Sequence, residues 1–142
     1  MSTLPARPRR CTLAVPGSSE KMMAKAAALS VDQVFLDLED AVAIGAKESA
    51  RGLAIKALTD LSWQARTLSV RINDVSTRWC HDDIIELVTH AGARLDTIIL
   101  TKAKSSSDVR FVHLLLEQLE CKLGLTKRCL LYTSPSPRDS TL

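Results

Sequence analysis

Short apolar runs alternate with amphipathic stretches along most of this chain. Within the longer stretches, apolar residues recur at intervals of three and four, which indicates helices, whereas the short runs are typical of buried strands. The predicted strands are Cys11–Val15, Gln33–Leu38, Leu68–Ile72 and Thr97–Leu100. Strands that alternate with helices form parallel sheets with right-handed crossovers. We therefore predict an α/β fold that contains four strand–helix (βα) units.

Turn and cap residues predict where the helices begin and end. Pro16-Gly17 interrupts the first strand, and Ser18 or Ser19 can cap the helix that follows. The buried face expected for this helix comprises Met22, Ala26 and Leu29. The second helix is expected from about Lys47 to Leu61, the third to end at Gly92, and the fourth to begin at Ser105–Ser107.

Polar clusters follow the carboxyl ends of all the predicted strands. They are Gly17–Ser19, Asp37–Asp40, Arg71–Asn73 and Lys102. This edge of a parallel sheet is where α/β proteins bind their ligands. The second cluster holds three carboxylates beside an apolar strand, which is costly unless each charge has a partner. We therefore favour an active-site edge over a simple strand end with a helix cap.

Composition narrows the class of protein. The 142 residues are 46% hydrophobic and 25% charged, which is normal for a soluble globular domain. No apolar run approaches the roughly 18 residues of a membrane span. A net charge of +3 and an aromatic content of 4%, without a basic stripe, argue against nucleic-acid binding. The four cysteines form no CxxC and fit no zinc spacing with the histidines, so we expect free thiols in the cytoplasm.

The two ends of the chain differ from the region between them. The first ten residues, MSTLPARPRR, read as a solvated arm or as an arm whose arginines meet phosphates. From Cys129 the sequence CLLYTSPSPRD has no helix or strand period and resembles a translated sequencing adapter. We expect residues 129–142 to be a disordered artefact, the alternative being a genuine Ser/Pro tail. The native sequence would then continue past Arg128, and the chain would be an N-terminal fragment.

Several motifs between these ends occur together in a specific order. They are RCTLAVPGSSEK (Arg10–Lys21), DQVFLDLEDAVA (Asp32–Ala43), K-x-x-x-R (Lys47 and Arg51), LSVRIND (Leu68–Asp74) and TRWCHDDIIELVTHAGARLDTIIL (Thr77–Leu100). With these motifs the chain resembles the citrate lyase beta-subunit-like (HpcH/HpaI aldolase) family of CoA-ester lyases, and within it the malyl-CoA lyases. The resemblance implies a TIM (β/α)8 barrel, of which residues 1–128 would be the N-terminal half.

The resemblance also implies an activity. Such enzymes use Mg²⁺ to cleave a 3-hydroxyacyl-CoA, such as malyl-CoA, into acetyl-CoA and glyoxylate. The metal-binding Glu and Asp come from later strands, so no metal ligand is expected in this chain, which should be inactive alone. The expected partner is a small CoA thioester, and the full-length protein is expected to be a homo-oligomer. The alternatives are an aldolase acting on a free hydroxy-dicarboxylate, a malyl-CoA thioesterase, and a non-catalytic half-barrel that only binds.

The family pattern assigns roles to individual residues. Arg71, in the VRIN motif, would be the catalytic arginine that binds the carboxylate of the 2-oxoacid, the alternative being a buried salt bridge to Glu39 or Asp40. The residues that would contact substrate or CoA are Ala14, Ser19, Lys21 and Arg71. Lys21 could instead be a solvated helix charge, and Ala14 replaces a bulky family residue. Asp37, Glu39 and Asp40 would hold the site, and Lys47 and Arg51 would pair with their loop. Thr101-Lys102 replaces the usual Pro-Lys pair.

Overall fold

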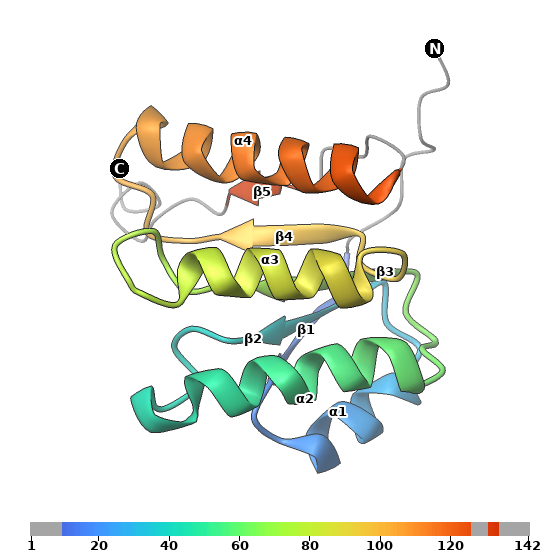
Figure 1. The fold of residues 1–142 in the computed structure, drawn as a ribbon. Coiled ribbons are helices and arrows are strands. Elements are labelled where there is room, and N and C mark those ends of the chain that lie inside the picture. The colour runs from blue at the N-terminus through green and yellow to red at the C-terminus, as the bar shows by residue number, and fades with distance from the viewer. Residues whose placement is uncertain (1–9, 126–130, 134–142) are drawn as a thin grey trace.

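The computed structural model describes residues 10–125 and 131–133. Within them, parallel strands form one sheet in the order of the sequence, and the α-helices cover one of its faces (Figure 1). The strands are β1 (Thr12–Pro16), β2 (Gln33–Asp37), β3 (Thr67–Arg71), β4 (Thr97–Leu100) and β5 (Leu131–Thr133). The helices are α1 (Glu20–Ala27), α2 (Lys47–Asp60), α3 (Cys80–Ala91) and α4 (Ser106–Leu123), and a 3₁₀ turn, η1 (Ile44–Ala46), precedes α2.

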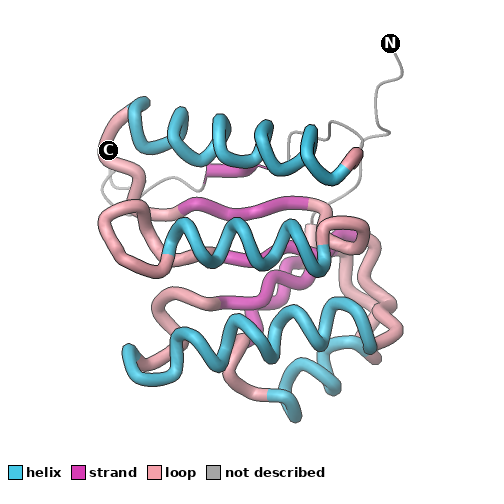
Figure 2. The backbone as a smooth tube through the Cα atoms, viewed as in Figure 1, coloured by secondary structure: helices cyan, strands magenta, loops and turns pink. Residues whose placement is uncertain are grey.

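The order of the strands shows which larger architecture this is. Each helix returns the chain to the start of the next strand, and every crossover places its helix on the same side of the sheet (Figure 2). In a (β/α)8 barrel the helices form such an outer layer, while the other face of the strands lines the interior. The prediction of about four βα units from the first half of such a barrel is therefore confirmed, with β5 in addition.

The hydrophobic core lies between the sheet and the helices. Side chains alternate between the two faces of a strand, so every second residue points toward the helical layer. The strand residues of the core that are at most 1% exposed are Val34, Leu36, Val70, Ile98 and Leu100. They pack in one cluster with Ala50, Ala54 and Leu58 of α2 and Ile84 and Leu87 of α3. This packing fixes the strands, and with them the residues that follow their carboxyl ends.

Helix α1 confirms its predicted cap but not its predicted face. The Ser19 hydroxyl accepts a hydrogen bond from the backbone N–H of Met22 at 3.2 Å. The residues that α1 buries are Met23, Ala26 and Ala27. Met22 and Leu29, expected inside, are 50% and 48% exposed. The helix ends at Ala27, so Leu29 lies beyond it, and the apolar period begins one residue later than predicted.

The structure also differs from expectation in the segment that begins at Cys129. Leu131–Thr133 form β5, in which Leu131, Tyr132 and Thr133 are the parallel register partners of residues 98–100 of β4. Leucine, tyrosine and threonine tolerate a strand well, and the edge of β4 offers backbone groups that need partners. The rest of that segment, like the arginine-containing arm at residues 1–9, lies outside the described residues.

The described cysteines are free thiols, as predicted. Cys11 and Cys121 are exposed, whereas Cys80, at the start of α3, is buried. Burial, with a smaller contribution from the nearby carboxylates of Asp83 and Asp74, raises the pKa of Cys80 to about 12. None of the described helices is both long enough and apolar enough to cross a bilayer.

Candidate active site

The register of the sheet brings the predicted site residues together at one edge. Pro16, Asp37 and Arg71 are successive register partners at the ends of β1, β2 and β3. Glu39 is the second residue after β2, and Lys102 is the second residue after β4 and reaches back to Glu39. Polar clusters that are separate in the sequence therefore form one site at the carboxyl edge of the parallel sheet, where such folds bind ligands.

Asp37 and Arg71 form the centre of this site. Nε of Arg71 donates to Oδ1 of Asp37 at 2.9 Å, and Nη2 of Arg71 donates to Oδ2. The same carboxylate accepts the backbone N–H groups of Glu39 at 2.8 Å and Ala41 at 3.1 Å. Burial raises the pKa of Asp37, but the hydrogen bonds from Arg71 and from the backbone outweigh it and leave that pKa below 3.8. The hydrogen bonds to Asp37 likewise raise the pKa of Arg71, so this pair stays ionised.

The pairing of Arg71 with Asp37 excludes one of the alternatives that the sequence left open. A salt bridge from Arg71 to Glu39 or Asp40 is not formed, because those two carboxylates bind Lys102. Asp37 instead holds Arg71, and the supporting role of Glu39 and Asp40 stays a prediction. The role of Arg71 toward a substrate remains a prediction.

Arg71 retains donors for a ligand after this pairing. Its side chain is 24% exposed, and among the described residues its Nη1 has no hydrogen-bond partner. The guanidinium carbon lies 5.4 Å from the centre of the Phe35 ring. Phe35 and Asp37 lie on the same face of β2, so an aromatic ring and a carboxylate together orient the planar guanidinium. Its remaining N–H groups could bind a carboxylate.

Glu39 and Asp40 form a second cluster around Lys102. Nζ of Lys102 lies 2.7 Å from Oε2 of Glu39 and 3.1 Å from Oδ1 of Asp40, and the Thr101 hydroxyl donates to Oε1 of Glu39 at 3.2 Å. Burial and the neighbouring Asp40 raise the pKa of Glu39, whereas the interactions with Glu39 and with the ammonium group of Lys102 lower the pKa of Asp40. The Thr101 hydroxyl makes a contact that the family's usual proline could not make, and Lys102 adopts a left-handed backbone with φ 58°.

Lys47 confirms its predicted contact with the carboxylate loop, whereas Arg51 does not. Nζ of the buried Lys47 donates to the backbone carbonyls of Leu38 at 3.1 Å and Glu39 at 2.5 Å. Arg51, expected to bind the same loop, pairs with two carboxylates of α3, those of Asp83 and Glu86. Lys47 and Arg51 lie four residues apart on the same face of α2, but one turn along the helix, so Lys47 reaches the loop after β2 while Arg51 reaches α3.

The remaining predicted contact residues lie around β1 and α1. Ala14 is exposed on β1 and is the register partner of Phe35. The Ser19 hydroxyl caps α1, and Lys21 is exposed on that helix. Their contacts with substrate or CoA remain predictions. Ala14 does lie beside the aromatic ring that faces Arg71, so its small side chain leaves that ring accessible.

Gly17 brings the turn after β1 close to Asp37. Its N–H donates to the carbonyl of Asp37 at 2.8 Å. A Cβ at this position would lie 2.8 Å from Cδ2 of Leu38 and 3.1 Å from the Asp37 carbonyl oxygen. Only glycine allows this close approach, which ties the β1 turn to the strand end that carries Asp37.

Sequence reasoning missed Phe35 and Asp83. Phe35 precedes Asp37 by two positions, and the period of two in a strand already places both on one face. Asp83 stands out in the sequence only as part of a family-like run, because its partners Arg51 and Asn73 come from other elements. No local pattern signals contacts of that kind.

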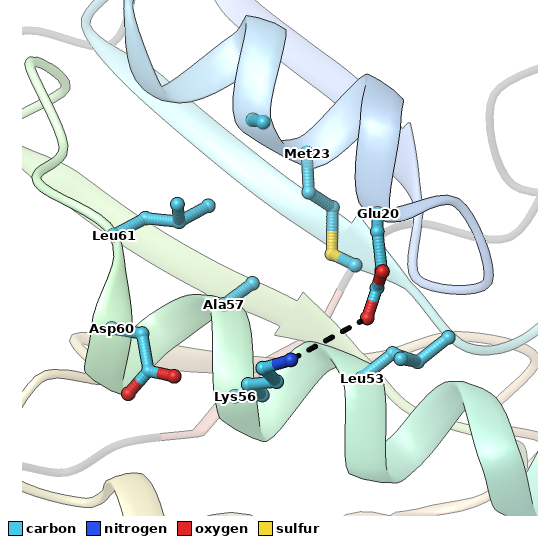
Figure 3. A pocket seen from close by; sticks show the side chains of 8 residues that line it. Glu20, Met23, Leu53, Lys56, Ala57, Asp60 and Leu61 are labelled. Carbon is cyan, nitrogen blue, oxygen red and sulfur yellow. Dashed lines mark ion pairs between the residues drawn. The ribbon is translucent and has the colours of Figure 1, made fainter.

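A pocket of about 210 Å³ lies elsewhere, between α1 and α2 (Figure 3). The residues that line it are Glu20, Met23, Ala24, Leu53, Lys56, Ala57, Asp60 and Leu61. Lys56 and Glu20 face one another across it, with Nζ and Oε1 3.8 Å apart. This pocket shares no residue with the Asp37–Arg71 pair or the Lys102 cluster, and we do not assign it to the same site.

The described residues do not by themselves fit a magnesium ion. Mg²⁺ prefers several oxygen ligands in nearly octahedral geometry. Within residues 10–125 and 131–133, no group of three or more His, Cys, Asp or Glu side chains is placed to hold a metal ion. Glu39 and Asp40, the carboxylates nearest to this edge after Asp37, are both bound to Lys102.

Comparison with known proteins gives a family for this arrangement. The sequence matches the family described as HpcH/HpaI aldolase/citrate lyase over residues 10–133. An L-malyl-CoA/beta-methylmalyl-CoA lyase of Cereibacter sphaeroides is 42% identical over 123 residues, which cover 87% of this chain and 39% of the relative. A (3S)-malyl-CoA thioesterase of the same species is 39% identical over 107 residues, which cover 75% of this chain and 36% of the relative.

A solved structure supports the same assignment. The citrate lyase beta subunit of M. tuberculosis, complexed with oxaloacetate and magnesium, is 33% identical with a TM-score of 0.58, covering 73% of this chain and 44% of that chain. This chain therefore spans only about two fifths of the proteins it matches. Its match to the family nevertheless includes all of the described residues, and the chain belongs to the HpcH/HpaI aldolase/citrate lyase family.

Proposed function

We propose that this chain supplies the carboxylate-binding part of a Mg²⁺-dependent carbon–carbon lyase, which cleaves a 3-hydroxyacyl-CoA such as malyl-CoA into acetyl-CoA and glyoxylate. The observation that carries the proposal is Arg71, held by Asp37 and Phe35 at the carboxyl edge of the sheet with donors left over. The 42% identity to a malyl-CoA lyase supports the choice of substrate class. The proposal includes a cytoplasmic homo-oligomer, as the family resemblance implies.

The chemistry requires a fixed cation. Cleavage releases a 2-oxoacid and an enolate of the acetyl thioester, so the negative charge must be stabilised as it develops. A guanidinium stays charged and binds a carboxylate through two parallel hydrogen bonds. Asp37 offsets part of the charge of Arg71, but it also fixes the plane of the guanidinium. The ligand then binds a preorganised group and loses less affinity to ordering the side chain.

Magnesium would polarise the oxo group of the 2-oxoacid, as metal ions do in such reactions. A solved relative contains magnesium and oxaloacetate, which supports a metal in this family. Because the described residues do not fit the ion, we propose that its Glu and Asp ligands lie on later strands of a longer native protein. Ala14, Ser19 and Lys21 would contact the CoA thioester, and Glu39 and Asp40 would hold the loop around Arg71 through Lys102.

The first experiment is to sequence the source clone or genome past the codon for Arg128. We expect the reading frame to continue into strands that carry a Glu and then an Asp, and we propose that the adapter-derived sequence begins near residue 129. The extended protein should cleave malyl-CoA only with Mg²⁺, and the 142-residue chain should not. If the Ser/Pro segment proves to be genomic, or if the short chain cleaves malyl-CoA, the proposal is wrong.

The arginine can be tested in the extended protein. Arg71→Lys removes the two-point geometry but keeps the charge, and we expect the KM for glyoxylate in the condensation direction to rise about 100-fold, the value of one or two charge-assisted hydrogen bonds. Arg110→Lys, an exposed position on α4, is the matched control and should leave KM unchanged. Equal KM values for the two variants would remove Arg71 from the site.

One relative favours a second candidate. The (3S)-malyl-CoA thioesterase is 39% identical to this chain, so hydrolysis of the thioester without cleavage of the carbon bond is the alternative. The products distinguish the two reactions, because a lyase releases glyoxylate and acetyl-CoA whereas a thioesterase releases malate and free CoA. Malate as the only acid product would replace the lyase by the thioesterase.

A further inference from the structure

A buried polar network lies behind the site, on the helical side of the sheet. Nε of Arg51, on α2, donates to Oδ1 of Asp83, on α3, at 2.9 Å. The other oxygen of Asp83 accepts the backbone N–H of Asn73 at 3.1 Å and its side-chain Nδ2 at 2.7 Å. Asp83 is fully buried, and Asn73 and Arg51 are 1% and 6% exposed. Two helices and the loop after β3 thus meet at one carboxylate.

This network holds the segment that carries Arg71. Asn73 follows Arg71 by two residues, at the start of the loop that leaves β3. The carbonyl of Arg71 accepts the N–H of Leu38 at 2.9 Å, and Ile72 donates its N–H to the carbonyl of Ile99 at 3.1 Å. The first bond ties the end of β3 to the segment after β2, and the second ties it to β4. Asp83 then binds the next residue, Asn73. The backbone around Arg71 is therefore anchored from β2, from β4 and from α3.

Burying these charged groups costs free energy, and joining two helices does not by itself require them. A buried carboxylate gives up its hydration, and well-packed apolar residues of similar volume hold helices together as well or better. Nη2 of Arg51 is also buried and has no hydrogen-bond partner among the described residues. Charged groups can instead restrict the network to a single geometry, because each oxygen of Asp83 has its own hydrogen-bond partners.

We propose that Asp83 is a positioning residue for Arg71: held by Arg51, it clamps Asn73 and so fixes the backbone from which the Arg71 guanidinium reaches Asp37. Asp83 touches neither Arg71 nor the proposed substrate position and acts through the loop. The inference rests on the proposed function for its purpose, since a fixed Arg71 matters for binding a carboxylate. The geometry itself does not depend on which reaction the family member performs.

The test measures Arg71 directly in the 142-residue chain. In nitrogen-15-labelled protein, the Nε–H of Arg71 should exchange slowly with water, because it donates to Asp37. In Asp83→Asn and Asn73→Ala we expect this exchange to accelerate about 10-fold relative to the backbone N–H of Val70 in β3, as for one weakened charge-assisted hydrogen bond. The comparison with Val70 removes any change that comes from global unfolding.

Glu86→Gln is the matched control. Glu86 also accepts a hydrogen bond from Arg51, at 2.7 Å, but its side chain is 46% exposed and binds nothing in the loop. This variant should leave the Arg71 signal unchanged. If Asp83→Asn does not fold, Asn73→Ala decides, because it keeps the ion pair between Arg51 and Asp83. Unchanged Arg71 exchange in Asn73→Ala, or equal acceleration in Glu86→Gln, overturns the proposal.

Binding of oxalate, a small dicarboxylate, separates this inference from the proposed function. The chain is titrated with oxalate while the Arg71 signal is followed. If oxalate leaves the signal unchanged in the wild-type chain, the carboxylate-binding role of Arg71 fails, while the positioning role is still judged by the exchange rates. If oxalate binds and the exchange rates are the same in all variants, the positioning role alone fails.

Discussion

Asp37 and Arg71 are register partners on adjacent parallel strands, and their side chains repeat that pairing through two hydrogen bonds between the carboxylate and the guanidinium. Asp37 is almost fully buried, while Arg71 remains partly open to solvent. The carboxylate has four donors around it, two from Arg71 and two from the backbone after β2. The ion pair therefore joins the strand end, the loop and the arginine into one unit.

The first prediction concerns the stability that this unit provides. Asp37→Asn keeps the shape of the side chain but removes its charge. The NH2 of the new amide, itself a donor, then lies against N–H donors. We expect the free energy of unfolding to fall by about 2 kcal/mol, the range for buried hydrogen bonds to charged groups. Urea unfolding followed by circular dichroism measures the change. Asp40→Asn, with a side chain that is 63% exposed, is the control and should change stability by less than about 0.5 kcal/mol. Equal losses in the two variants would contradict a central role for the Asp37 charge.

The second prediction concerns pH. The folded-state pKa of Asp37 lies below its ordinary value of 3.8, so the folded protein favours the ionised form. The stability contributed by this group is therefore fully present above pH 3.8 and is lost as the pH falls through the lower, folded-state pKa. The difference in unfolding free energy between wild type and Asp37→Asn should be constant at neutral pH and should shrink below pH 3.8. A difference that grows in acid would mean that folding raises the pKa of Asp37 instead of lowering it.

The third prediction tests the close approach at Gly17. In Gly17→Ala the new methyl group must displace Leu38 or the Asp37 carbonyl, and overpacking of this kind costs about 1–3 kcal/mol. Gly52→Ala is the matched control, because Gly52 lies within α2 and a Cβ there meets nothing within 4 Å. That variant should gain about 1 kcal/mol from helix propensity. Thermal unfolding of both proteins should shift in opposite directions, and a shift of the same sign would be inconsistent with the packing described.

The fourth prediction distinguishes the cysteines by reactivity. Cys80 is 1% exposed and burial raises its pKa to about 12, so almost no thiolate forms near neutral pH. Cys11 and Cys121 are exposed and should react with iodoacetamide at mildly alkaline pH in the native protein. Mass spectrometry of proteolytic peptides identifies each site. Cys80 should be labelled only after denaturation, and labelling at the rate of Cys121 would mean that α3 opens readily.

The fifth prediction concerns association. Within the described residues, β1 pairs only with β2, so its other edge presents unpaired backbone groups. An exposed strand edge can pair with another chain, and a half-barrel has no closing strand to prevent it. We expect the isolated chain to self-associate, and sedimentation velocity at several concentrations measures this. A monomer at all concentrations, with one sharp cooperative melting transition, would contradict the expectation.

Most of the fold follows from local patterns. Apolar runs separated by amphipathic stretches place every strand from β1 to β4 within about one residue, and the serine before α1 caps it as expected. The phase of a short helix is harder to predict, because Met22 and Met23 are both apolar and packing against β1 and α2 decides which one is buried. β5 could not be anticipated from its own residues, since its partner β4 supplies the pairing that makes it a strand.

The site, like the fold, can be predicted from the sequence only in part. Its location at the carboxyl edge follows from the order of the elements, and so does the presence there of Arg71 and the carboxylates. Which carboxylate binds which cation does not follow, because Asp37, Glu39 and Asp40 are close in sequence and two cations compete for them. The choice depends on side-chain direction along β2, which points Asp37 across to β3 and lets the following loop carry Glu39 to Lys102.

The sequential order of the strands has a consequence for synthesis. Within the described residues, β2, β3 and β4 each pair with the strands directly before and after them, so the pairing of these three strands does not wait for a late segment. Domains generally fold from the N-terminus as they leave the ribosome, at about 5–20 residues per second. The layer that holds Asp37 and Arg71 could therefore assemble cotranslationally, before any later part of a longer polypeptide has been made.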